Sequence, residues 1–197
     1  MPRTPTAALL ALATLTSGCL PGGPGAVTAS PVPGLEVSVD ESFYEVAGLN
    51  ARDLNHELSR RGPSHEGRSW QGQTDFRVAY SYSRERGADG CRAAEPRVRV
   101  GLVTTLPRWR DRDDAPERLR SDWDLYLSRL EEHEEGHRRI AILAGQELLE
   151  DVSALEAPDC EALRRTATEV AESYQKIVAL EQKGWDEETA HGLDVGN

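Results

Sequence analysis

The sequence is poor in cysteine, methionine and aromatic residues, and it is short of basic charge. Its 197 residues include 3 cysteines, 1 methionine and 6% aromatic residues, and the formal net charge is −11. So few cysteines exclude a small disulfide-dense scaffold, which needs a much higher share of them. The deficit of Lys and Arg argues against nucleic acid or an anionic membrane surface as a direct partner.

A long apolar run is also missing outside the N-terminal segment. There, residues 7–15 form a short apolar stretch after Arg3, and small residues then lead to Cys19. This is the pattern of a secretory signal, and the stretch is too short for a membrane-spanning helix. We therefore expect residues 1–18 to be a signal peptide and the mature protein to be exported.

The segment around Cys19 predicts how the exported protein is held. Residues 16–19 read Thr-Ser-Gly-Cys and resemble the lipobox of bacterial lipoproteins, whose cysteine becomes the lipidated N-terminus. Thr stands where Leu is more usual, so cleavage without lipidation is the alternative. We expect a cell-envelope lipoprotein, facing the periplasm or the cell surface and touching the membrane through its lipid only, or otherwise a secreted protein.

The Pro- and Gly-rich residues 19–34 predict a flexible tether, and residues 35–197 predict one domain.

Two cysteines remain once Cys19 is set aside. An even pair in an exported protein favours a disulfide, here between Cys91 and Cys160. Two free thiols or a thiolate zinc ligand are the alternatives. The disulfide is preferred because neither cysteine sits in a C-x-x-C or C-x-H pairing.

The hydrophobic pattern predicts an α+β fold. Apolar and polar residues alternate in several segments, as they do in strands with one buried face, while two later segments carry a helical period. We expect an N-terminal antiparallel sheet with one short helix, packed on two long C-terminal helices. Asn50 and Asp114 are the expected caps of the short and the first long helix, and Gly184 the expected end of the second. Strands are predicted for residues 35–39, 43–46, 74–82 and 97–103, and helices for 48–62, 114–152 and 157–184. The inner face of the last helix is predicted to hold Leu163, Thr166 or Ala167, Val170, Tyr174, Ile177 and Leu180.

The first long helix contains the motif H-E-x-x-H at residues 133–137. His133 and His137 fall where its helical period requires apolar residues, one turn apart and about 40° from each other in projection. Two imidazoles so placed can reach one zinc ion at about 2.0–2.1 Å. Glu134 can then hold and activate the zinc-bound water. The alternative is a pair of hydrogen-bonded core histidines on a helix with a solvated Glu-rich face, but that leaves the inward position of both histidines unexplained.

A catalytic zinc needs three protein ligands and one open position. His191 is the first candidate for the third ligand, because Gly192 beside it would let the chain turn in close to the metal. Glu169 and Glu172 on the preceding helix are the alternatives. We expect one Zn²⁺ per chain.

Several short motifs carry a resemblance to a known family. They are Gly62-Pro63 after the first helix, Leu106-Pro107 after the last strand, the Trp-rich lead into the motif from Trp123 through His137, and Trp185-Asp186 with Thr189-Ala190-His191-Gly192 near the C-terminus. Over residues 35–192 the chain resembles a bacterial family described as predicted secreted zinc-dependent proteases and catalogued as domain of unknown function 922. That family more often has Tyr where Trp185 stands. The resemblance implies a zincin-like fold and zinc-dependent peptidase chemistry.

The function expected from these features is a zinc metallopeptidase that hydrolyses peptide bonds of peptides or proteins in the cell envelope. In zincins an edge strand beside the active helix receives an extended peptide, and residues 97–103 are the counterpart by analogy. The alternative is a non-catalytic envelope lipoprotein that acts as a protein-interaction module with a structural or vestigial metal site. A closed four-ligand site would favour that alternative.

Overall fold

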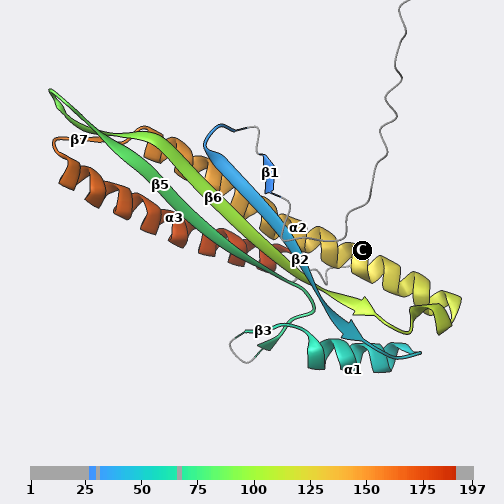
Figure 1. Cartoon of the computed structure of the whole chain (residues 1–197). Coiled ribbons are helices and arrows are strands. Elements are labelled where there is room, and N and C mark those ends of the chain that lie inside the picture. The colour runs from blue at the N-terminus through green and yellow to red at the C-terminus, as the bar shows by residue number, and fades with distance from the viewer. Residues whose placement is uncertain (1–26, 30–31, 66–67, 190–197) are drawn as a thin grey trace, which may run out of the picture.

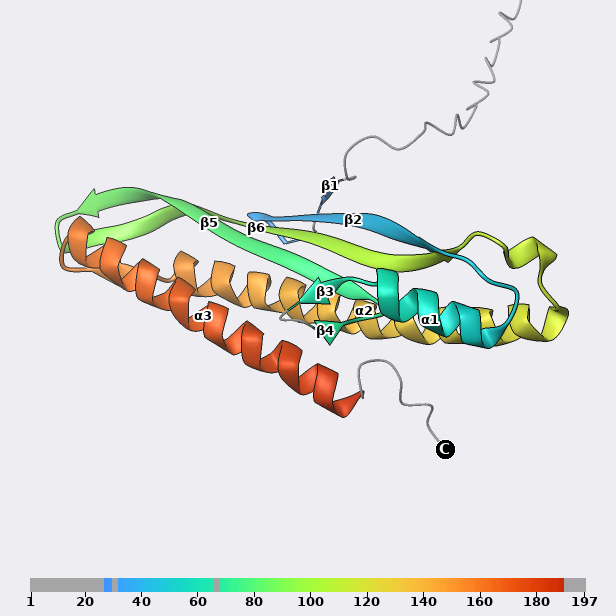
Figure 2. The same ribbon diagram turned by 90° about the horizontal axis from the view of Figure 1, so that it is seen from below.

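A computed structural model describes residues 27–29, 32–65 and 68–189. The predicted signal peptide, Cys19 and His191 lie outside these residues. The described part is elongated and has two layers, a sheet of long strands on one side and two long helices on the other (Figure 2). Among the described residues, no helix is both long and apolar enough to cross a membrane.

Three long strands make up most of the main sheet (Figure 1). Its order is β1-β2-β6-β5, with the short β7 also paired to β6, while β3 and β4 form a separate hairpin. The strands are β1 (Val27–Ala29), β2 (Leu35–Val46), β3 (Ser64–His65), β4 (Arg68–Ser69), β5 (Gln73–Gly87), β6 (Gly90–Trp109) and β7 (Glu156–Ala157). The helices are α1 (Ala51–Arg61), α2 (Glu117–Ser153) and α3 (Cys160–Glu188), and a 3₁₀ turn, η1, covers Arg112–Asp114. The α+β class is confirmed.

The predicted antiparallel arrangement of the sheet is wrong, because the sheet is mixed. β5 and β6 form a long antiparallel hairpin, but β6 runs parallel to β2 from the pair Leu35 and Val98 to the pair Val46 and Trp109. β6 follows β5 in sequence and inserts between β5 and β2 in space. Residues 97–103 therefore lie on a central strand, not on an edge. The alternation of apolar and polar residues shows that one face of the strand is open to solvent. An edge strand and a central strand can both have such a face.

The inner face of the sheet packs on α2, a helix of 37 residues that is about 56 Å long. The shared core includes Val98, Val100 and Leu102 of β6 and Leu148 of α2. Gly145 lets the two layers approach closely, since a Cβ at this position would lie 2.5 Å from a methyl group of Val100. A second, smaller core joins α1 to the start of α2 through Val46, Leu54, Leu58, Trp109, Ala115 and Trp123.

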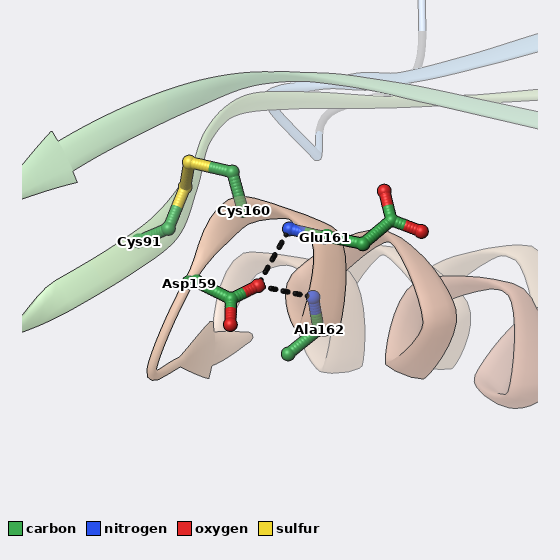
Figure 3. Close-up of a disulfide and its surroundings, with 5 residues drawn as sticks. All are labelled: Cys91, Asp159, Cys160, Glu161 and Ala162. Carbon is green, nitrogen blue, oxygen red and sulfur yellow. Dashed lines mark hydrogen bonds between the residues drawn. A yellow bond between two sulfur atoms is a disulfide. The ribbon is translucent and has the colours of Figure 1, made fainter.

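Helix ends follow the predictions in part. The side chain of Asn50 accepts a hydrogen bond from the backbone N–H of Asp53, as expected of the α1 cap. Asp114 does not cap α2, because it belongs to the 3₁₀ turn and Pro116 precedes the helix without a side-chain cap. At the start of α3, Asp159 accepts hydrogen bonds from the backbone N–H groups of Glu161 and Ala162 (Figure 3).

The predicted disulfide is confirmed. Cys91 near the start of β6 is bonded to Cys160, the first residue of α3, across a sequence separation of 69 residues (Figure 3). The bond holds the N-terminal end of α3 against the tip of the β5–β6 hairpin.

The second long helix differs from its prediction in length and in its inner face. α3 continues through Gly184 to Glu188. Leu163 and Ala167 are buried along it as expected, but Leu180 is 71% exposed and Ile177 43% exposed, and Val178, which was not predicted, is buried instead. Leu180 lies two residues from Val178 and so on nearly the opposite side of the helix.

Candidate metal centre

The two histidines of the motif point their rings toward the same place. α2 buries one face against the sheet, and His133, on that face, has 5% of its side chain exposed. His137 follows one turn later, and its Nε2 lies 3.1 Å from Nε2 of His133. The helix period thus brings the two ring nitrogens together, as the motif predicts.

A carboxylate from α3 completes a group of three. Oδ1 of Asp186 lies 3.3 Å from Nε2 of His133 and 3.1 Å from Nε2 of His137. Within the described residues this is the group whose side chains could jointly hold a metal ion. Glu169 and Glu172 do not belong to it. Glu172 is 14 residues before Asp186 on the same helix, about 21 Å along the axis.

Hydrogen bonds at the C-terminal end of α3 favour one tautomer of the His133 imidazole. The Thr189 hydroxyl donates to the backbone carbonyl of Trp185 over 2.7 Å and lies 2.8 Å from Nδ1 of His133. Because its own proton is committed to that carbonyl, the Thr189 oxygen accepts from Nδ1–H. In this neutral tautomer Nε2 of His133, which faces Asp186 and His137, is the acceptor nitrogen of the ring.

Gln182 favours the same tautomer of the His137 imidazole. Its amide N–H₂ donates to the backbone carbonyl of His137 over 3.1 Å, and this contact orients the amide. Oε1 of Gln182 accepts a hydrogen bond from Nδ1–H of His137. In this tautomer both histidines turn the acceptor nitrogen Nε2 toward Asp186, and each has the outer hydrogen bond that metal-bound histidines almost always make.

Three acceptor atoms that face one another need a cation between them. Two imidazole lone pairs and a carboxylate oxygen at 3.1–3.3 Å repel each other unless a proton or a metal ion is shared. Ligands of a tetrahedral zinc at about 2.0–2.1 Å lie about 3.3–3.4 Å apart. The nitrogen and oxygen ligand types also suit zinc, so the residues present fit this metal.

Glu134 lies beside this group and is 2% exposed. Its Oε2 accepts a hydrogen bond of 2.7 Å from the Thr74 hydroxyl at the start of β5. Burial raises the pKa of the Glu134 carboxyl, and the hydrogen bond from Thr74 and the nearby His137 oppose that rise. A buried carboxylate with a raised pKa is suited to accept and return a proton near neutral pH.

The group opens into a cavity of about 390 Å³ between α2, α3 and the start of β5. His133, Glu134, His137 and Asp186 line one part of the cavity. The rest of the lining carries no charged side chain and consists of Trp70, Gln71, Gly72, Gln73, Thr74, Phe76, Leu130 and Gln182. A bound molecule can therefore reach all four ionisable groups.

Trp185 locks the end of α3 onto α2. Its indole N–H donates to the backbone carbonyl of His133 over 2.9 Å, and its ring stacks on the His133 ring. Gly136 provides the space, since a Cβ there would lie 2.2–2.4 Å from three indole atoms. The glycine inside the motif thus sets the distance at which Asp186 meets the two histidines.

Comparison with known proteins identifies the family. Residues 41–192 match the family described as bacterial protein of unknown function (DUF922). The chain belongs to the DUF922 family. The matched range contains His133, Glu134, His137, Asp186 and, beyond the described residues, His191. No curated protein and no solved structure matches the chain.

In this DUF922 chain the sequence marks Trp185, Asp186 and Thr189 only as family motifs and does not mark Gln182, so their contacts with the two histidines are not predicted. Gln182, Trp185, Asp186 and Thr189 are spaced i, i+3, i+4 and i+7, which places them on one face of a continuing helix. That spacing is the signal that could have found them. His191, the third ligand predicted from the sequence, lies outside the described residues and stays a prediction.

Proposed function

We propose that the protein is a zinc-dependent peptidase of the cell envelope, with His133, His137 and Asp186 as metal ligands and Glu134 as the general base. The observation that carries the proposal is the convergence of Nε2 of His133, Nε2 of His137 and Oδ1 of Asp186 at 3.1–3.3 Å, beside a buried carboxylate and an open cavity. The envelope location rests on the predicted signal peptide and on Cys19.

Each residue of the site has a defined role in this proposal. The zinc, when bound, would polarise the scissile carbonyl and lower the pKa of a coordinated water. Glu134 would take the proton of the attacking water and deliver it to the leaving amine. Gln182 and Thr189 favour the tautomer of the two imidazoles in which Nε2 can bind a metal. Asp186 adds a negative charge that offsets the charge of the cation.

The sheet supports a polypeptide substrate over a small molecule. β5 is the last strand on its side of the main sheet, as far as the described residues go. The first residues of β5, Gln73 and Thr74, line the cavity. An extended peptide could add to this strand edge, with main-chain hydrogen bonds providing the affinity. By analogy with zincins, β5 replaces residues 97–103 as the candidate substrate strand.

The competing candidate is a structural metal site in a non-catalytic envelope lipoprotein. The sequence continues from Thr189, whose hydroxyl contacts His133, to His191 only two residues later. If His191 and Asp186 both bind the metal, four protein ligands close the site and leave no position for a substrate.

Zinc content and coordination of the purified protein decide between these candidates. We expect one zinc per chain, three protein ligands and one water by X-ray absorption. Asp186→Asn should weaken zinc binding by more than about 100-fold, the upper end of the effect of an outer-shell partner. Glu187→Gln is the matched control, because Glu187 is the next carboxylate on α3, exposed and paired with Lys183, and it should bind zinc as the wild type does.

Hydrolysis of fluorescein-labelled casein tests the role of Glu134. Glu134→Gln should retain zinc and lose at least about 100-fold in rate, because a general base contributes that much or more. Hydrolysis at the wild-type rate in this variant would contradict the mechanism. Loss of zinc in Glu134→Gln, or loss in both Asp186→Asn and His191→Ala with four protein ligands in the wild type, would favour the structural site.

A further inference from the structure

We propose that two threonines of the sheet, Thr74 and Thr104, are positioning residues that hold the carboxylate of Glu134 in its working orientation. This inference deepens the proposed function and rests on it. Thr74 contacts Glu134 directly, and Thr104 acts through Thr74.

The three side chains form a continuous chain from the sheet to the helix. The hydroxyl oxygens of Thr104 on β6 and Thr74 on β5 lie 3.1 Å apart, and the two residues are cross-strand partners. The Thr74 hydroxyl then donates to Oε2 of Glu134 over 2.7 Å. Glu134 has 2% exposure and Thr104 none, so both ends of this chain of hydrogen bonds are buried.

Counting the protons fixes the direction of the chain. A threonine hydroxyl has one proton to donate and two lone pairs that accept. Thr74 uses its one proton in the hydrogen bond that it donates to Glu134, so the hydroxyl of Thr104 must be the donor in the hydrogen bond to Thr74. This accepted bond strengthens the bond that Thr74 donates, because hydrogen bonds in a chain polarise one another.

The second oxygen of the carboxylate faces a different neighbour. Gly72 lines the cavity, and a Cβ there would lie 2.7 Å from Oε1 of Glu134. The missing side chain leaves space at Oε1, while Thr74 occupies Oε2. The pair of threonines therefore assigns Oε1 as the oxygen that exchanges the proton with substrate and water.

Packing alone does not explain the hydroxyl at position 104. The other inward residues of this part of β6 are apolar, among them Val100, Leu102 and Leu106, all nearly fully buried. Valine has the same shape as threonine, and a buried hydroxyl costs free energy unless it is hydrogen-bonded. The partner that offsets this cost is Thr74, and through it Glu134.

Substitutions in the full-length zinc protein test the proposal with casein hydrolysis, zinc content and crystal structures. Thr74→Val should keep one zinc per chain and KM within about twofold, while kcat falls roughly 10- to 100-fold, as a misplacement of about 1 Å can cause. Thr74→Ser should restore kcat, and Thr104→Val should lower it less than Thr74→Val. Thr105→Val is the matched control on the opposite face of β6 and should leave kcat unchanged.

Crystal structures of the zinc-bound wild type and Thr74→Val supply a readout that needs no activity. We expect the Glu134 carboxylate to turn away from its wild-type orientation in Thr74→Val and to keep it in Thr74→Ser. An unmoved carboxylate, or a Thr74→Val protein with kcat within twofold of the wild type, overturns the positioning role. Absence of casein hydrolysis by the wild type would instead count against the proposed function, and the two crystal structures would still judge the position of Glu134.

Discussion

At the scale of single residues, Gly136 links the motif to the third candidate ligand. It is buried on α2, between the two histidines in sequence, and the indole of Trp185 occupies the space where its side chain would be. Asp186 is the next residue after Trp185. A side chain at position 136 would therefore push away the end of α3 that carries Asp186, without changing either histidine.

Gly136→Ala should weaken zinc binding by at least about 10-fold, comparable to the loss of an outer-shell partner. The helix itself should not suffer, because Ala is favoured over Gly in a helix by about 1 kcal/mol. Competition with a chromophoric zinc chelator measures the affinity. Gly184→Ala is the control, since no atom lies within 4 Å of a Cβ at Gly184 in α3; it should stabilise the protein and bind zinc normally. Unchanged affinity in Gly136→Ala would mean that Trp185 does not position Asp186.

How far residues could be predicted depends on whether their signal is local. His133, Glu134 and His137 follow from one short motif on one helix face. The contact of Thr74 with Glu134 joins residues 60 positions apart, and that of Thr104 with Thr74 joins residues 30 apart. Single buried threonines carry no periodic signal, so the support around Glu134 could be found only once the sheet register was known.

At the scale of elements, α3 connects two features at opposite ends. Its first residue is bonded to Cys91, and its last turn carries Trp185 and Asp186, followed by the C-cap Thr189. Cys160 and Asp186 are 26 residues apart on this helix, about 39 Å along the axis. The disulfide should therefore contribute to stability and leave the local geometry of the candidate metal centre intact.

Replacing both cysteines by serine should lower the free energy of unfolding by about 4 kcal/mol. In the chain-entropy model this is the contribution of a disulfide that closes a loop of roughly 70 residues. Urea denaturation of the variant and of the oxidised wild type measures the difference. Zinc affinity is the internal control and should stay within about threefold. A difference in unfolding free energy under 1 kcal/mol would show that the bond adds little to the fold.

Elements were predictable where the pattern is local, and their arrangement was not. The alternation in residues 97–103 and the cap at Asn50 gave the correct local structure. The same alternation suits an edge strand and a central strand with one open face, so the insertion of β6 between β2 and β5 had no local signal. For α3, Gly184 favours a helix end, but the face spaced 182, 185, 186 and 189 continues the helical period, and the helix runs on to Glu188.

At the scale of the whole molecule, the end of α3 is attached mainly by polar contacts. Val178 is its last buried apolar residue, and the contacts that follow are those of Gln182, Trp185, Asp186 and Thr189 with the two histidines. The sheet and the first half of α3 have instead a continuous apolar core. Metal binding should therefore affect the two halves of α3 unequally.

If zinc joins α2 to α3 as proposed, its removal should loosen residues 178–188 more than any other part of the described fold. Zinc at 100 times its dissociation constant stabilises the metal-binding state by about 2.7 kcal/mol, which corresponds to roughly 5–10 °C in Tm for a domain of this size. Amide hydrogen exchange with and without a chelator should show faster exchange in residues 178–188, because their attachment runs through the metal ligands. Exchange in β6 and in residues 160–174 should change little.

Asp186→Asn should behave like the chelated wild type whether or not zinc is added. Equal acceleration across the molecule would mean that the metal supports the whole core, and no change in Tm or exchange would mean that no metal joins α2 to α3.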